Sequence, residues 1–266
     1  PILTRVFDKL PVQLTGMYLE PDGSLPNHGL DPLQPENRAE LQQRVADDGA
    51  DIGFAFDGDG DRFFTIDDRG QFVSGDFLTA LMAQYYLEKY PGAKIIYDVR
   101  ASWAVPDLIR QAGGIPLMER VGHAFIKRRM AQENAVFAGE VTGHYYFRDF
   151  FFADSGIVPC LVLMEMLSKK GARLSDLLKP LEAKYFISGE INTRITAEAK
   201  AKMTELAEAY DDAEIHWLDG ISVTYENWHF NVRPSNTEPL LRLNLEAKTR
   251  ELMEAKRDEV LEIIRA

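Results

Sequence analysis

Between residues 72 and 184 the sequence alternates between short apolar stretches and longer segments of helical periodicity, and this alternation limits the fold more than any other feature. Strands and helices alternating at this spacing are typical of βαβ units and a largely parallel sheet. Ligands of such sheets bind at the carboxyl ends of the strands. We expect helices over residues 77–89, 105–112, 124–132 and 157–169, and strands over 94–98, 115–118 and 135–139.

The segments on either side have a different pattern. Residues 1–71 begin with Pro- and Gly-rich turns and continue with a helix over 36–48 and strands over 51–56 and 63–66. Residues 185–266 contain strands over 186–195, 221–225, 228–232 and 240–246, with helices over 197–210 and 250–265. We therefore predict mixed α/β domains over 1–71 and 72–184, followed by a small α+β domain over 185–266.

The run Asp57-Gly58-Asp59-Gly60-Asp61-Arg62 joins two of the predicted strands. Carboxylates at alternate positions can converge on one cation where the backbone turns tightly, and glycine permits that turn. Oxygen ligands suit Mg²⁺ or Ca²⁺ rather than zinc, and we favour Mg²⁺. We call residues 57–62 the metal loop.

Two other interpretations of the metal loop are weaker. An EF-hand needs Gly at its sixth position and Glu at its twelfth, where this chain has Arg62 and Asp68, and its flanks should be helices. A plain acidic turn would leave three carboxylates to repel one another. Arg62 could be a surface ion pair, but a metal loop that meets a phosphate needs such a positive charge.

Two further loops are rich in polar side chains. The first, Gly139-Glu140-Val141-Thr142-Gly143-His144, follows a predicted strand and offers a carboxylate, a hydroxyl and an imidazole that suit sugar hydroxyls. We call residues 139–144 the sugar loop, although an ordinary polar loop is equally consistent with the segment alone. The second, Arg233-Pro234-Ser235-Asn236-Thr237-Glu238-Pro239, offers donors suited to phosphate, or a capped turn. We call residues 233–239 the phosphate loop.

Several single residues add to this set. Arg100 follows the strand over 94–98, at the sheet edge where ligands bind. His123 opens a predicted helix and could contact an anion or donate a proton, although a lone histidine is more often structural. Lys127, Arg128 and Arg129 follow on that helix and are more typical of a solvated face, although one of them could guide an anion.

The overall composition excludes several classes of protein. A net charge of −12 over 266 residues argues against a nucleic-acid partner. The single cysteine, Cys160, rules out an intramolecular disulfide framework, which favours a cytoplasmic protein. We see no apolar run of membrane-spanning length and no signal peptide, so we expect no membrane partner.

Taken together, the three loops resemble the α-D-phosphohexomutase superfamily. The metal loop (DGDGDR), the sugar loop (GEVTGH) and the phosphate loop (RPSNTEP) occur in the same order, and the resemblance covers essentially the whole chain. Residues 145–149 and 219–233 are most similar to the phosphomannomutase/phosphoglucomutase branch. The phosphoglucosamine mutase branch is less similar.

The resemblance implies a role for each loop. Mg²⁺ would bind Asp57, Asp59 and Asp61, with Arg62 against the transferring phosphoryl group. Sugar hydroxyls would bind Glu140, Thr142 and His144, and the non-reacting phosphate would bind Arg233, Ser235, Asn236 and Thr237. His123 would lie near the reacting oxygen. Arg100 stands where many members have a lysine, and its very high pKa makes an acid–base role doubtful.

The implied reaction interconverts hexose 1-phosphate and hexose 6-phosphate. It passes through a hexose 1,6-bisphosphate, which also acts as activator. The family's nucleophile is a phosphoserine in a T-x-S-H-N-P-like loop, and no such loop occurs here; residues 24–28 echo it only superficially. We therefore expect an N-terminally truncated fragment, inactive alone, containing the back of domain two and domains three and four. A monomer and a dimer both remain open.

Three alternatives stay open from the residues. A phosphoglucosamine mutase would carry the same loops. A non-catalytic protein that binds sugar phosphates would explain the missing serine loop if the chain is complete. A metal-dependent phosphatase could use the Asp57-x-Asp59 pattern, but it would leave the two later loops unexplained.

Overall fold

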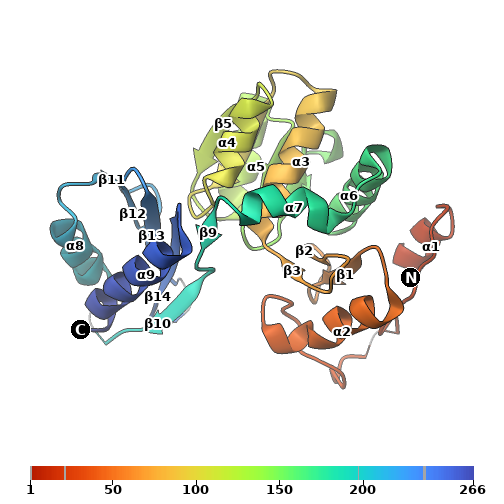
Figure 1. Cartoon of the computed structure of the whole chain (residues 1–266), viewed down its shortest axis with the longest axis horizontal. Helices are drawn as coiled ribbons and strands as arrows, with labels where there is room; N and C mark the ends of the chain where they lie inside the picture. The colour runs from red at the N-terminus through yellow and green to blue at the C-terminus, as the bar shows by residue number, and fades with distance from the viewer. Residues whose placement is uncertain (1, 21, 197, 236–237) are drawn as a thin grey trace.

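The computed structural model describes residues 2–20, 22–196, 198–235 and 238–266, and it arranges them around three sheets (Figure 1). The second sheet lies in the middle of the molecule, with the N-terminal sheet at one end and the third sheet at the other. The mixed α/β prediction, with a small α+β portion at the C-terminus, is confirmed.

The N-terminal sheet is antiparallel, in the order β1-β2-β3. Phe56 pairs with Phe63, so the metal loop forms the tip of the β1–β2 hairpin. The predicted helix over 36–48 is split by Arg38 into a 3-10 turn and α2. The elements are α1 (Ile2–Phe7), η1 (Pro35–Asn37), α2 (Ala39–Asp48), β1 (Gly53–Phe56), β2 (Phe63–Ile66) and β3 (Phe72–Val73).

The second sheet has the order β5-β4-β6-β7-β8. Only β5, β4 and β6 are parallel, so the expectation of a largely parallel sheet is wrong for its other half. The reason is local: β6 and β7 are joined by residues 140–144, which is too short for a crossover and long enough for a hairpin. The strands are β4 (Lys94–Asp98), β5 (Ile115–Glu119), β6 (Phe137–Gly139), β7 (Tyr145–Phe147) and β8 (Ala153–Asp154).

Helices cover this sheet and connect it to the third (Figure 1). Two segments were not expected from the sequence, the β7–β8 hairpin and α7, which contains Pro180. The helices are α3 (Gly75–Lys89), α4 (Ala104–Gln111), α5 (His123–Glu133), η2 (Arg148–Phe150), α6 (Ile157–Lys170) and α7 (Leu174–Glu182).

The third sheet is antiparallel, in the order β10-β14-β13-β12-β11, with β9 paired to β14. The strand expected over 186–195 is interrupted, because Gly189 has a positive φ of 69°. The elements are β9 (Phe186–Ile187), β10 (Ile191–Arg194), α8 (Ala199–Ala209), β11 (Glu214–His216), β12 (Ile221–Thr224), β13 (Trp228–Pro234), β14 (Leu240–Ala247) and α9 (Arg250–Arg265).

Two large apolar cores hold these parts together. The first combines α3, α6 and the second sheet, and it includes Phe63 from the N-terminal hairpin. The second lies between the third sheet and its helices, around Leu206, Phe230 and Leu243. The metal loop is thus anchored to the central body, while the third sheet packs around a core of its own. In the described part of the chain no helix is long and apolar enough to cross a bilayer.

Candidate active site

The metal loop brings its three aspartates together. Carboxylate oxygens of Asp57, Asp59 and Asp61 all lie within 4.8 Å of one another. The turn depends on Gly60, whose φ is +76°, and on Arg62, whose backbone N–H donates to Asp57 Oδ1 at 3.1 Å. An all-oxygen donor set of this kind fits a hard divalent cation.

Arg62 compensates part of the negative charge in the metal loop. Its Nε donates to Asp57 Oδ2 at 2.6 Å, and its Nη1 lies 3.2 Å from Asp31 Oδ1. Burial alone would raise the pKa of Asp57, but the hydrogen bonds from Arg62 hold it below its ordinary value. Among the described residues Asp61 accepts no hydrogen bond from an arginine, and burial together with the neighbouring aspartates raises its pKa despite the nearby His144. A bound cation would therefore stabilise the ionised form of Asp61, whose pKa is raised, more than that of Asp57, whose pKa Arg62 already lowers.

The sugar loop is the tight turn between β6 and β7. Glu140 N–H donates to the His144 carbonyl at 2.9 Å, and Gly143 N–H donates back to the Glu140 carbonyl at 3.0 Å. The carbonyl of Gly143 accepts from Phe63 N–H at 2.9 Å, directly after the metal loop. The two loops are therefore joined by a main-chain hydrogen bond.

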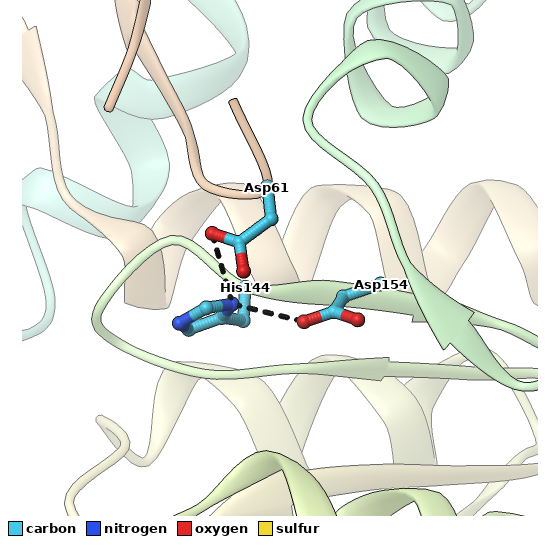
Figure 2. A group of neighbouring side chains, drawn as sticks. All are labelled: Asp61, His144 and Asp154. Carbon is cyan, nitrogen blue, oxygen red and sulfur yellow. Dashed lines mark hydrogen bonds and ion pairs between the residues drawn. The ribbon is translucent and has the colours of Figure 1, made fainter. Parts of the chain in front are cut away.

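A side-chain cluster joins the same two loops (Figure 2). His144 Nδ1 lies 3.2 Å from Asp154 Oδ2 and 3.8 Å from Asp61 Oδ1. Burial would lower the pKa of His144, but Asp154, Glu140 and Asp61 raise it overall. Lys127 Nζ reaches the other oxygen of Asp154 at 2.7 Å.

Asp154 and Lys127 show what the sequence-based reasoning missed. Asp154 lies ten residues beyond His144, and only the β7–β8 hairpin brings it back beside the sugar loop. Burial opposes its ionisation, yet hydrogen bonds from His144 and Lys127 hold its pKa well below the usual range. Lys127 is partly exposed, as expected for a solvated face, and its ammonium group is also paired with Asp154.

Arg100 lies at the carboxyl end of β4, as expected, but its side chain is fully buried. It makes a two-point contact with Asp98, with Nε–Oδ1 at 3.0 Å and Nη2–Oδ2 at 2.9 Å. Its Nη2 also lies 3.8 Å from Glu140 Oε2 and 3.5 Å from Thr142 Oγ1. Burial lowers the pKa of Arg100, but its carboxylate partners Asp98, Glu140 and Glu190 outweigh burial and raise the pKa overall, so the guanidinium group stays charged.

The phosphate loop connects β13 to β14 and is linked to Arg100 through Glu190. Glu190 lies 3.3 Å from Arg100 Nη1 and 3.0 Å from Arg242 Nη1, and Arg242 Nη2 contacts Ser235 Oγ at 3.4 Å. Neither Glu190 nor Arg242 was predicted, because neither belongs to a loop motif. Asn236 and Thr237 lie outside the described residues.

Arg233, at the start of the phosphate loop, is buried close to two other arginines. It is 9% exposed, and its Nε has no hydrogen-bond partner among the described residues. Burial lowers its pKa, and the nearby Arg100 and Arg242 lower it further. A buried guanidinium group beside two others is a favourable place for an anion.

His123 stands apart from these contacts. It is the first residue of α5, and its side chain is exposed. The preceding Gly122, with φ of 124°, donates its N–H to Glu140 Oε2 at 3.3 Å, which ties this turn to the sugar loop. The adjacent Val121 N–H donates to Asp219 Oδ2 at 3.0 Å, on the turn before β12.

Comparison with known proteins identifies this combination of fold and loops. Three models of the phosphoglucomutase/phosphomannomutase family match in succession: alpha/beta/alpha domain II over residues 1–70, alpha/beta/alpha domain III over 74–185 and the C-terminal domain over 190–263. The chain therefore belongs to the phosphoglucomutase/phosphomannomutase family, within the α-D-phosphohexomutase superfamily.

Individual relatives agree with this family. The chain is 43% identical over 256 residues to a phosphomannomutase of Salmonella montevideo and 43% identical over 259 residues to phosphohexose mutases of Xanthomonas campestris pv. campestris. A crystal structure of a phosphoglucomutase/phosphomannomutase family protein from Burkholderia thailandensis superposes with a TM-score of 0.88 at 33% identity over 99% of this chain. The matches cover 96% of this chain in both sequence comparisons, but only 56%, 58% and 57% of the three relatives.

Proposed function

We propose that this chain forms the metal-, sugar- and phosphate-binding part of a phosphomannomutase/phosphoglucomutase, an isomerase that interconverts hexose 1-phosphate and hexose 6-phosphate. The proposal is supported by the family and by relatives named phosphomannomutase. The observation that carries it is Arg233 at the start of the phosphate loop: its buried guanidinium group lies near Arg100 and Arg242, and its Nε has no hydrogen-bond partner among the described residues, which favours an anion there.

In this proposal each loop binds one part of the substrate. Arg233 and Ser235, with Asn236 and Thr237, hold the phosphate that does not react. Glu140, Thr142 and His144 accept or donate hydrogen bonds to the sugar hydroxyls. Because the two ends of the sugar exchange places during the reaction, one phosphate loop serves both the 1-phosphate and the 6-phosphate.

The metal loop faces the phosphate that is transferred. Asp57, Asp59 and Asp61 would hold Mg²⁺, which would offset the negative charge of the phosphoryl group. Arg62 adds a positive charge at the same end of the loop. His123 is exposed at the start of α5, so it can approach the reacting oxygen, while the buried Arg100 holds Asp98 and Glu190 in place.

Further elements of the proposal come from the family. A phosphoserine donates the phosphoryl group and a hexose 1,6-bisphosphate is the intermediate; the loop that carries this serine is not among these 266 residues. We also propose that domain boundaries fall near residues 71 and 184 and that the protein is cytoplasmic.

The first test is binding of mannose 1-phosphate to this chain with Mg²⁺ present, measured by isothermal titration calorimetry. Arg233→Ala should weaken binding at least tenfold, because it removes a charge-assisted phosphate contact. Arg257→Ala on α9, whose guanidinium group is paired with the neighbouring Asp258, should change nothing. Absence of binding to the unsubstituted chain, or equal binding to both variants, would refute the proposal.

Turnover of mannose 1-phosphate by this chain with glucose 1,6-bisphosphate would show that another residue here carries the phosphoryl group.

A further inference from the structure

Tyr146 lies directly beneath the sugar loop. It is the middle residue of β7, paired with Ala138 on β6 and with Asp154 on β8, and it is completely buried. Its hydroxyl donates to Glu140 Oε1, and its ring lies nearly parallel to that of His144, with centroids 6.2 Å apart. One side chain therefore contacts both ends of the loop.

Glu140 is only 2% exposed, so the few partners of its carboxylate determine how that group is oriented. Tyr146 occupies Oε1, whereas Oε2 accepts from Gly122 N–H at 3.3 Å and lies 3.8 Å from Arg100 Nη2. Burial raises the pKa of Glu140, and the hydroxyl of Tyr146 opposes that shift. A carboxylate has about four lone-pair positions, so two remain for other donors.

Tyr146 is a dependable donor at this position. Burial, followed by the adjacent Glu140, raises its pKa far above the ordinary value, so the phenol keeps its proton. Without that hydroxyl, Oε1 of Glu140 would be a buried acceptor with no partner, and the strongest remaining attraction would come from Arg100. The carboxylate would then turn toward Arg100.

We propose that Tyr146 is a positioning residue for sugar recognition. By holding Oε1 of Glu140, it stops the carboxylate from turning further toward Arg100, which lies 3.8 Å from Oε2, and so preserves the orientation in which Glu140 meets the hexose hydroxyls. The inference rests on the proposed function, because it assigns Glu140 to those hydroxyls. It goes beyond the three loop motifs, since Tyr146 belongs to none of them and acts only through Glu140.

The chain provides a matched control in the preceding residue. Tyr145 is also completely buried on β7, but it points to the opposite face of the strand, and its hydroxyl has no hydrogen-bond partner among the described residues. Tyr145→Phe and Tyr146→Phe remove the same atom from adjacent residues. Only the second removes a bond to Glu140.

The test compares two ligands. We expect Tyr146→Phe to weaken mannose 1-phosphate binding about tenfold, as for loss of a hydrogen bond to a charged group, and to leave inorganic phosphate binding unchanged. Tyr145→Phe should change neither. In a Glu140→Ala background, Tyr146→Phe should have no further effect. Unchanged mannose 1-phosphate affinity, or an equal loss in the Glu140→Ala background, would overturn the inference.

A second measurement needs no ligand. In carbon-13 spectra of side-chain-labelled glutamate, the pKa of Glu140 should rise in Tyr146→Phe and stay the same in Tyr145→Phe, because only the first loses a donor to the carboxylate. An unchanged pKa of Glu140 in Tyr146→Phe would also overturn the inference. If the unsubstituted chain bound no mannose 1-phosphate, the proposed function would fail; if it bound and Tyr146→Phe bound equally well, only this inference would fail.

Discussion

Asp76 should make the stability of this protein depend on pH. It lies in the first turn of α3 and is 6% exposed. Burial raises its pKa from the ordinary 3.8 to about 6, with Asp98 and Glu246 adding to the shift and hydrogen bonds from Ser102 N–H and Ser74 Oγ opposing it. An ionised Asp76 is therefore a cost to the folded state.

The surroundings of Asp76 explain why so few groups offset this cost. It lines a cavity of about 30 Å³ between the second and third sheets, together with Arg100, His229 and Glu246. Arg100 is already engaged by Asp98. Glu246 Oε2 and His229 Nε2, on the third sheet, have no hydrogen-bond partner among the described residues.

The sign and size of the effect follow from the two pKa values. Because the folded pKa is above the unfolded one, the contribution of Asp76 to stability is fully present below about pH 4 and is lost as the pH rises through about 6. The shift corresponds to about 3 kcal/mol in full, of which about 2 kcal/mol falls between about pH 4.5 and about pH 7.5.

Urea unfolding of the Asp76→Asn variant tests this prediction. Asparagine keeps one carbonyl acceptor for Ser102 N–H and cannot ionise. As the pH rises from about 4.5 to about 7.5, the free energy of unfolding of the variant should therefore increase by about 2 kcal/mol relative to that of the unsubstituted chain. Asp47→Asn, on the exposed face of α2, should show no such trend. A difference for Asp76→Asn that stays constant within about 0.5 kcal/mol would refute the reasoning.

Three further substitutions test the loops by isothermal titration calorimetry. Asp59→Asn should lower Mg²⁺ affinity about tenfold and Asp47→Asn should not; unchanged affinity would exclude Asp59 as a ligand. Gly156→Ala would place a Cβ 2.5 Å from the Gly60 carbonyl, so it should displace the metal loop and weaken Mg²⁺ binding, and an unaltered affinity would contradict that contact. Glu190→Gln removes the charge that neutralises two arginines, so inorganic phosphate should bind several-fold tighter; equal or weaker binding would contradict the prediction.

The elements that the sequence predicted well are those in which one local signal decides the structure. The strand β4 and the helix α9 have the expected bounds, because each is a regular apolar pattern between clear breaks. The three loops also lie between strands, where glycine, proline and polar residues interrupt those patterns. The residues of each segment were therefore sufficient to predict both the regular elements and the loops between them.

The β7–β8 hairpin escaped prediction because its strands are only three and two residues long. Residues 145–153 hold two runs of three aromatic residues separated by Arg148 and Asp149, so they show no alternation that would mark a strand. Because this hairpin was not predicted, the contacts of Asp154 and Tyr146 could not be predicted either, since they depend on the register of its strands. Glu190 was hidden for a related reason, since its partners Arg100 and Arg242 lie 90 and 52 residues away in sequence.

The residues found only in the structure have a common effect on the loops. Asp154 contacts His144, and Tyr146 donates a hydrogen bond to Glu140. Glu190 bridges Arg100 and Arg242. Each contact is polar and joins parts of the molecule that pack around different strands or different cores. Polar contacts between separately packed units permit relative motion more readily than apolar ones. A phosphate entering between the arginines would compete with Glu190 for them, so one of the contacts that join the second and third sheets is also one that a ligand can replace.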